Sequence, residues 1–304
     1  MSWKQLRWVL GLLGGLLAAW LVTGALDRNR GDTGGIDISA ATAEPLTLIR
    51  VLGPDPADSV RVEWNDGWLV NGFPADSDLV SQAVAALVTA PRGVLVARNP
   101  SNHARMGLAD ENGRRLVLGP PDNPDLVLLL GETGSAGRFV RIPGQDEVYS
   151  VPPEALEAAD RDATGWRDRV IAEIDTSTIG SIVVKRGDSE VRLVRGAQWM
   201  VDGAPADSAA VDRVLVALTQ VLASGFPPDS AVLAADFDRP DAVLDVYAAG
   251  RVSAATKPLL SLLFLELESG SFMVRRGDRP LAFGLAQWSG ARLLPSAETL
   301  LAAN

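Results

Sequence analysis

The ten residues Trp68–Ser77, WLVNGFPADS, return as WMVDGAPADS at Trp199–Ser208, at a constant spacing of 131 positions. The same spacing relates apolar residues further along the chain, among them Val80 and Val211. A match of this length predicts that one structural unit is used twice. The repeated residues are those that turns, helix caps and cores require, so the match points to an architecture and assigns no catalytic group.

A β hairpin is expected at the start of each copy, because apolar and polar residues alternate there. Asn71-Gly72 and Asp202-Gly203 are expected to end these hairpins, since Gly, Asn and Asp adopt positive φ at low cost. The predicted strands are 60–64 and 68–70 in the first copy, and 182–184, 191–194 and 199–201 in the second.

A helix is expected after each hairpin. Pro74 and Pro205 block further strand pairing, and the Asp76 and Asp207 side chains can accept hydrogen bonds from the free amides that open a helix. Apolar residues then follow helical spacing, clearly in the second copy and more weakly in the first. Each helix is therefore predicted to pack on its hairpin as a core element.

Strand-like runs follow each predicted helix and decide the fold class. They are 93–97, 115–118, 126–130, 138–142 and 147–151 in the first copy, and 242–247, 259–267, 272–275 and 291–294 in the second. Residues 153–169 are predicted to form a short charged helix that leads into the second copy. The predicted fold is α+β, with two tandem repeats of antiparallel sheet plus helix, at residues 46–174 and 175–304.

An uncharged run from Trp8 to Leu26 precedes the repeats, with Lys4 and Arg7 before it. At about 1.5 Å per residue it spans roughly 28 Å, which is close to the hydrocarbon core of a bilayer. Residues 1–26 are therefore predicted to form a short cytoplasmic tail and one transmembrane helix, and residues 27–45 a flexible linker. A cleaved signal peptide and a hydrophobic helix inside a soluble core are the alternatives.

The composition argues against several functions. The absence of cysteine removes disulfides, thiol catalysis and thiolate metal sites. A formal net charge of −10 opposes binding to nucleic acid or to anionic lipid, because both require a positive protein surface. Cationic and polar partners remain compatible with this charge.

A polar segment, Arg98–Arg105, follows a predicted strand and contains the only histidine of the chain. One histidine excludes a multi-histidine zinc site, and no serine lies in the Gly-x-Ser-x-Gly pattern of a nucleophile elbow. We therefore assign no catalytic, metal-binding or cofactor-binding residue and expect no cofactor. A solvated loop is one interpretation of the segment, and a partner contact is the other. The candidate partner-binding residues are Arg98, Asn99, Asn102, His103 and Arg105.

Structural roles, and not binding roles, are also expected for a glycine-rich stretch and for three tryptophans. Gly131–Gly137 lacks the Gly-Lys-Ser/Thr ending of a phosphate-binding loop and precedes a predicted strand, so a hairpin loop is expected. Trp68, Trp166 and Trp199 are expected to cover apolar cores, as tryptophans in or beside hairpins usually do. Stacking of these tryptophans on sugars is the alternative.

Two groups of carboxylates are candidates for acid/base catalysis or for calcium binding. Asp160, Asp162 and Asp168 alternate with arginines, as on a solvent-facing helix, and Asp122 lies near Asp125. Neither group has the spacing of a calcium-binding loop. Both are interpreted as surface charges.

The order of these features resembles the bacterial family catalogued as domain of unknown function 4340. The resemblance rests on the N-terminal apolar helix, the hairpins ending in Trp68 and Trp199, the Pro-Ala-Asp helix starts, the loop from Arg98 to Leu108, and Trp166–Arg169. It covers most of the chain after residue 45. The resemblance implies a single-pass protein of the bacterial inner membrane with an accessory role, since members of this family are often encoded beside ABC-type transport systems similar to those of gliding motility. The resemblance supplies no catalytic residue, and the second copy shows no obvious counterpart of Arg98–Arg105.

The expected function is that of a membrane-tethered, non-enzymatic accessory or scaffold protein, associated with an ABC-type transport complex. The bulk of the chain is expected on the extracytoplasmic side, where it would bind other envelope proteins and no nucleic acid. A glycan- or peptide-binding module with a groove between the repeats is the alternative. A hydrolase that uses His103 or the carboxylates near Asp160 is a more distant one.

Overall fold

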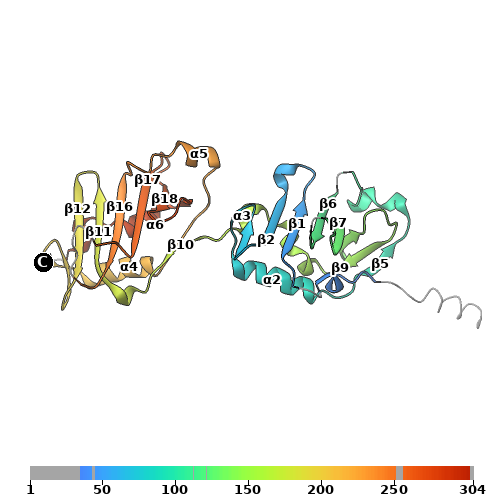
Figure 1. Ribbon diagram of the computed structural model, residues 1–304, viewed down its shortest axis with the longest axis horizontal. Coiled ribbons are helices and arrows are strands. Elements are labelled where there is room, and N and C mark those ends of the chain that lie inside the picture. The colour runs from blue at the N-terminus through green and yellow to red at the C-terminus, as the bar shows by residue number, and fades with distance from the viewer. Residues whose placement is uncertain (1–34, 43–44, 112, 121, 251–255, 302–304) are drawn as a thin grey trace, which may run out of the picture. The chain divides into compact units, whose positions relative to one another are not determined.

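The computed structural model describes residues 35–42, 45–111, 113–120, 122–250 and 256–301. The chain divides into two compact units between Arg167 and Asp168. Each unit contains one large antiparallel sheet and few helices (Figure 1). The fold is therefore a mixture of α and β structure dominated by two large antiparallel sheets, as the alternating strand patterns predict.

The sheet of the first unit has nine strands in the order β4-β3-β2-β1-β6-β7-β8-β9-β5. These strands are β1 (Leu48–Leu52), β2 (Val60–Trp64), β3 (Trp68–Val70), β4 (Phe73–Pro74), β5 (Val94–Ala97), β6 (Arg114–Leu118), β7 (Leu126–Gly134), β8 (Gly137–Arg141) and β9 (Val148–Val151). The helices are α2 (Ser77–Val88) and α3 (Ala163–Trp166). Short 3-10 turns are η1 (Ser39–Thr42), η2 (Pro56–Asp58), η3 (Pro100–Asn102), η4 (Ala104–Met106), η5 (Pro153–Ala155) and η6 (Glu157–Asp160).

The large sheet of the second unit has eight strands in the order β14-β13-β12-β11-β16-β17-β18-β19, and β10 pairs separately with β15. The strands are β10 (Val170–Glu173), β11 (Ile179–Arg186), β12 (Ser189–Arg195), β13 (Trp199–Val201), β14 (Ala204–Pro205), β15 (Gln220–Leu222), β16 (Ala242–Ala248), β17 (Leu260–Glu266), β18 (Phe272–Arg276) and β19 (Ala282–Leu285). The helical elements are η7 (Thr176–Thr178), α4 (Ser208–Thr219), α5 (Asp229–Ala234), α6 (Gln287–Leu293) and α7 (Ala297–Leu300).

A tight reversal links the third and fourth strands of each hairpin region. Asn71 and Asp202 adopt φ values of 47° and 48°, and each is followed by a glycine with positive φ. The side-chain oxygen of Asn71 accepts a hydrogen bond from the amide of Arg61 at 2.8 Å, and that of Asp202 accepts one from the amide of Arg192 at 3.0 Å. Side chain and backbone together therefore fix the direction in which the chain leaves the sheet.

A helix begins directly after each reversal, as the sequence predicts. Asp76 accepts hydrogen bonds from the amides of Asp78 and Leu79, and Asp207 accepts one from the amide of Ala210. These bonds satisfy donors that the first helical turn leaves free. The amides of the two aspartates donate in turn to carbonyl oxygens at the end of their own units, of Trp166 at 2.9 Å and of Leu300 at 2.8 Å.

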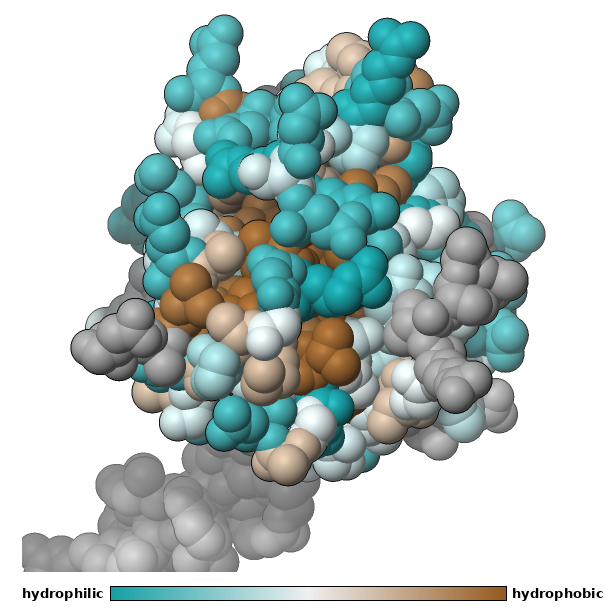
Figure 2. Space-filling view, turned by 90° about the vertical axis from the view of Figure 1, so that its left-hand side faces the viewer, coloured by the Kyte–Doolittle hydropathy of each residue, from teal (hydrophilic) through white to brown (hydrophobic). Residues whose placement is uncertain are grey.

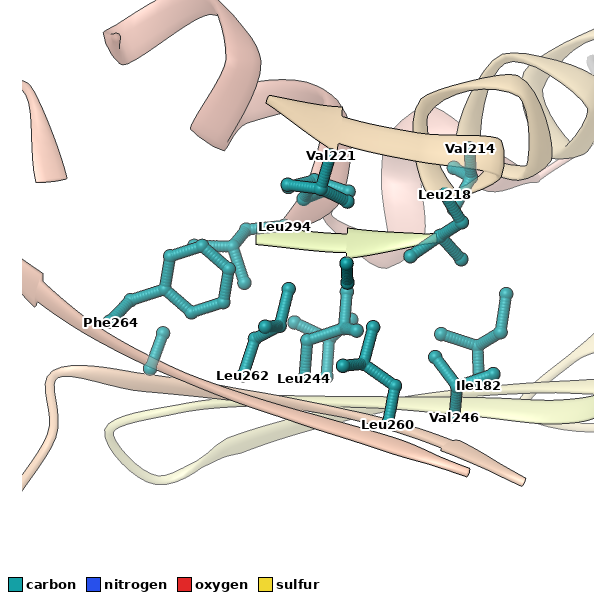
Figure 3. Close-up of a cluster of buried hydrophobic side chains, with 14 of the residues drawn as sticks. Ile182, Val214, Leu218, Val221, Leu244, Val246, Leu260, Leu262, Phe264 and Leu294 are labelled. Carbon is teal, nitrogen blue, oxygen red and sulfur yellow. The ribbon is translucent and has the colours of Figure 1, made fainter. Parts of the chain in front are cut away.

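The main core of each unit lies between its sheet and its long helix. Val80 and Leu87 of α2 pack on the first sheet, and Val214 and Leu218 of α4 pack on the second. Figure 3 shows the second core, where the sheet side chains point toward α4 and β15. Each fully buried Leu, Ile or Phe contributes roughly 1.5–3 kcal/mol before entropy is subtracted. The labelled side chains are Ile182, Val214, Leu218, Val221, Leu244, Val246, Leu260, Leu262, Phe264 and Leu294.

A smaller cluster lies on the opposite face of each sheet. In the first unit Leu108, Leu129 and Val148 pack together with Met106, beneath the segment that contains η3 and η4. In the second unit Phe237, Met273 and Ala282 pack with residues of α5. Each sheet is therefore covered on one face by its long helix and on part of the other face by a short helical segment.

Three sequence-based assignments are corrected. Residues 291–294 do not form a strand, because 291–293 complete α6, and the last strand of the second sheet is β19. Strand β1 is present although no strand was predicted there. Residues 153–169 form several short turns and α3 in place of one charged helix.

The predicted linker, 27–45, needs a correction for its described part. Ile36 and Ile38 are buried in the main core of the first unit, and Asp37 pairs with Arg92 at 3.1 Å. The unit therefore begins before residue 46. At its other end the chain divides before β10, because β10 pairs with β15 of the second unit, so the predicted boundary after residue 174 lies inside that unit.

The predicted transmembrane segment, within residues 1–26, lies outside the described residues. None of the described helices combines the length and the apolar character needed to cross a membrane.

Replacing either helix-capping aspartate should destabilise only the unit that contains it. Asp76→Ala or Asp207→Ala leaves first-turn amides without their acceptor, which costs about 0.5–2 kcal/mol. Amide hydrogen exchange on the full-length chain, read separately for 35–167 and 168–301, measures each loss. Asp212→Ala, on the exposed side of α4, is the control and should change little, whereas equal losses in both units would contradict the assignment.

Candidate functional site

The polar segment Arg98–Arg105 forms two short 3-10 turns at the surface of the first unit. Two residues after the segment, Gly107 has a φ of 71°, which allows the chain to turn back toward the sheet. The ring nitrogen Nε2 of His103 lies 3.0 Å from the carbonyl oxygen of Asp146, in the loop between β8 and β9. The segment is thus a folded part of the unit, held in place by a neighbouring loop.

Several of the predicted partner-binding residues have structural contacts within the segment. The side chain of Asn99 accepts a hydrogen bond from the amide of Ser101 at 3.0 Å and so opens η3. Arg105 donates to the side-chain oxygen of Asn102 at 3.1 Å. These bonds, together with the His103 contact, fix the backbone, and they leave the guanidinium groups as the charges that face solvent.

Arg98 is the most available of the predicted residues. It is exposed, and among the described residues it forms no ion pair. Its charge acts on Tyr149 of β9, where burial and the nearby Glu147 raise the pKa of the phenol while Arg98 opposes that rise. Arg98 therefore presents an exposed positive charge at the start of the segment and forms no ion pair within the described part of the chain.

A buried arginine, which no local sequence pattern predicts, holds the chain just after the segment. Arg141 of β8 has only 2% of its side chain exposed. It donates to the carbonyl oxygens of Leu108 at 2.8 Å and Gln145 at 2.9 Å, and it pairs with Asp110 at 2.9 Å. Because a buried guanidinium requires several acceptors, these bonds connect the chain after η4 to the loop after β8.

The carboxylates of the first candidate group, Asp160, Asp162 and Asp168, have local structural contacts. Asp160 pairs with the buried Arg138 at 2.7 Å. Asp162 accepts from the amide of Gly165 and opens α3, and Asp168 accepts from the amide of Val170. Within the described part of the chain, no three His, Asp or Glu side chains are grouped so that they would hold a metal ion.

The glycine-rich stretch and the tryptophans agree with their structural interpretations. Gly131–Gly137 completes β7 and turns into β8, which is the predicted hairpin loop. Trp166 is fully buried, and Trp68 and Trp199 pack at the borders of the two main cores. Trp64 is 54% exposed and meets Trp68 edge to face, with ring centroids 5.6 Å apart.

The second unit has a different segment at the place that corresponds to Arg98–Arg105. In the first unit η3 and η4 follow the strand after the long helix, and in the second α5 occupies that place and contains no arginine or lysine. Leu233 of α5 is 88% exposed. A structural counterpart therefore exists, although the positive charges of the first unit are not repeated.

An open groove lies at one end of the second unit. Its floor contains Val184, Val191 and Leu294, and Glu190 and Glu298 are among the polar residues that line it. Its volume is about 470 Å³. Figure 2, which views the molecule from the left-hand side of Figure 1, shows apolar side chains lying between polar ones on that face. The groove has a size suited to a small ligand or a side chain of a partner.

One comparison with known proteins identifies the family. The family described as Domain of unknown function (DUF4340) matches residues 68–240, from β3 of the first unit to the residues before β16 of the second. The chain belongs to this family. No curated protein and no solved structure matches it. Membership agrees with the resemblance found in the sequence and assigns no activity to any residue.

Arg141 should be essential for the order of the polar segment. Arg141→Ala removes three charge-assisted contacts and leaves a cavity, with an expected loss of about 2–4 kcal/mol. Limited proteolysis should then cut between residues 98 and 110 much faster than in the unchanged chain. Arg161→Ala, which removes a more exposed arginine whose pair with Glu157 is 3.7 Å long, should cost less than about 1 kcal/mol. Unchanged protection in Arg141→Ala would refute the supporting role.

Proposed function

We propose that this protein is a membrane-tethered, non-enzymatic accessory subunit of an ABC-type transport complex of the bacterial envelope, built from tandem repeats of one unit. In this proposal residues 1–26 anchor the chain in the inner membrane, and both units lie on the extracytoplasmic side. The shared strand order of the two large sheets, together with the 131-residue sequence spacing, supports the tandem-repeat origin.

One observation carries the role in partner binding. The segment Arg98–Arg105 is held by the contacts of Asn99 and His103, and Arg141 fixes the chain just after it, while the side chains of Arg98 and Arg105 are exposed. A rigid support lowers the entropy cost of presenting charged side chains to a partner. The exposed guanidinium groups of Arg98 and Arg105 favour recognition of an acidic surface on a partner.

The contacts of the candidate acid/base groups in the described part of the chain favour a non-enzymatic role in this proposal. His103 contacts a backbone carbonyl oxygen, and Asp160, Asp162 and Asp168 hold structural contacts. An acid/base pair requires a titratable group that reaches a substrate, and these groups are engaged elsewhere. The groove of the second unit favours the alternative function, a glycan- or peptide-binding module.

Crosslinking in living cells tests the accessory role. The tagged full-length chain should capture permease or ATPase subunits of a transporter, and a chain that lacks residues 46–304 should not. Arg98→Ala combined with Arg105→Ala should lower the captured amount by about tenfold or more, because two interface arginines together contribute at least 1.4 kcal/mol.

Arg213→Ala combined with Arg279→Ala is the matched control, since both arginines are exposed in the second unit. This control should leave capture unchanged. Capture of no transporter subunit by the unchanged chain would contradict the accessory role and direct attention to ligand binding in the groove.

A further inference from the structure

The ends of the two large sheets differ in how they are protected. An edge strand leaves main-chain groups unpaired, and proline blocks pairing with another chain because it has no amide hydrogen. Pro74 lies in β4 and Pro205 in β14, at one end of each sheet. At the other end of the second sheet, Gly225 bridges to β19 and is followed after one residue by Pro227 and Pro228. Proline therefore lies in the edge strand at two of the four ends and close to the edge at a third.

Strand β5, at the fourth end, has no such block. Its sequence is Val-Leu-Val-Ala, at the positions that correspond by the 131-residue spacing to Gly225-Phe226-Pro227-Pro228. Among the described strands it pairs only with β9, Ile36 bridges to Gly93 just before it, and Figure 1 shows it at the border of the first sheet. Val94 is 67% exposed and Val96 is 39% exposed. The same place in the two units is thus closed by prolines in one and lined by exposed valines in the other.

The orientation of the main-chain amides and carbonyls in β5 favours pairing of another strand with its outer edge, the side away from β9. The amide of Gly93, just before the strand, donates to the carbonyl oxygen of Ile36 at 2.8 Å, on the side away from β9. Because main-chain groups alternate along a strand, the amide and carbonyl of Leu95 also face away from β9. A register shift after Leu95 leaves Val96 without a partner residue in β9. Beyond Gly93, and with respect to the residues that the structure describes, the outer edge of β5 therefore offers main-chain hydrogen-bonding groups next to apolar side chains.

Positive charges flank this edge. Arg92 precedes β5 and is 71% exposed while it pairs with Asp37, and Arg98 follows β5 without a described ion pair. Arg105 lies further along the same segment and is exposed. An incoming strand with carboxylates would pair with these guanidinium groups. A second copy of this chain is less suitable, because antiparallel pairing of two β5 strands would bring Arg98 of one copy near Arg92 of the other.

We propose that β5 binds an extended, acidic segment of a partner protein as an additional β strand. This inference rests on the proposed function, because it identifies the chemistry of the partner that the segment Arg98–Arg105 recognises. Main-chain hydrogen bonds to β5 supply affinity, and Val94, Val96 and Arg98 supply selectivity for apolar and acidic side chains.

Binding of a defined peptide to the full-length chain tests the proposal. The probe is a ten-residue peptide of alternating Glu and Val with blocked ends, and titration calorimetry measures its affinity. A peptide with Lys in place of Glu, and one methylated on alternate backbone nitrogens, should each bind at least about tenfold more weakly, since the first reverses the charge and the second removes main-chain donors.

The variants Val96→Glu and Arg98→Glu should each weaken binding of the Glu-Val peptide by about tenfold or more, because each places a negative charge next to an acidic peptide. Their matched controls are Val194→Glu, a strand valine of the second unit with 42% exposure, and Arg279→Glu, an exposed arginine of that unit. The controls should bind the peptide as the unchanged chain does, and circular dichroism should show that all four variants fold.

Three results would overturn the proposal. The first is that the Glu-Val peptide does not bind the unchanged chain. The second is that the methylated peptide binds the unchanged chain as tightly as the Glu-Val peptide does, or that the Arg98→Glu variant binds the Glu-Val peptide as tightly as the unchanged chain does. The third is self-association of the unchanged chain that Val96→Glu abolishes, because the occupant would then be a second copy. Transporter subunits that still crosslink to Val96→Glu at the unchanged level would reject β5 as their site and leave the accessory role intact.

Discussion

The reversal from sheet to helix is the constraint on which both units depend. Positive φ at Asn71 and Asp202 turns the chain, and one capping aspartate in each unit then starts the helix that closes the core. Those aspartates also donate their own amides to the last residues of their units. The start of the helix, the direction of the hairpin and the end of the unit are therefore fixed at one place, which explains why the sequence is most alike there.

The face of each sheet away from its long helix is where the two units differ. In the second unit α5 packs apolar residues on Phe237 and Met273 and carries no cation. In the first unit the corresponding segment is anchored by the buried Arg141 and presents Arg98 and Arg105. The same contrast appears at the neighbouring sheet end, where prolines follow the bridge to β19 in the second unit and β5 has exposed valines in the first. In the first unit, β5 and the segment Arg98–Arg105 follow one another directly in the chain. Our proposals assign partner binding to these two neighbouring features.

The sequence predicted the elements whose signals are local. The hairpin turns and the capping aspartates follow from the backbone preferences of single residues, and the long helices follow from apolar periodicity. Residues 291–294 misled the prediction because a short apolar run fits a buried helix as well as a strand. Arg141 was missed because its burial depends on distant carbonyl oxygens, those of Leu108 and Gln145. The contrast between Val96 and Pro227 was visible in the sequence, but its meaning required the order of strands.

The central claim is that each unit folds by itself, because its own chain reversal and its own capping aspartate join the sheet, the long helix and the end of that unit. The most direct test is to produce residues 168–304 alone and to follow their unfolding in urea by circular dichroism. The account predicts a cooperative transition and slow amide exchange in β11, β16 and β17, as in the full-length chain. An excised unit without a cooperative transition, or one that folds only when residues 35–167 are added, would contradict the account.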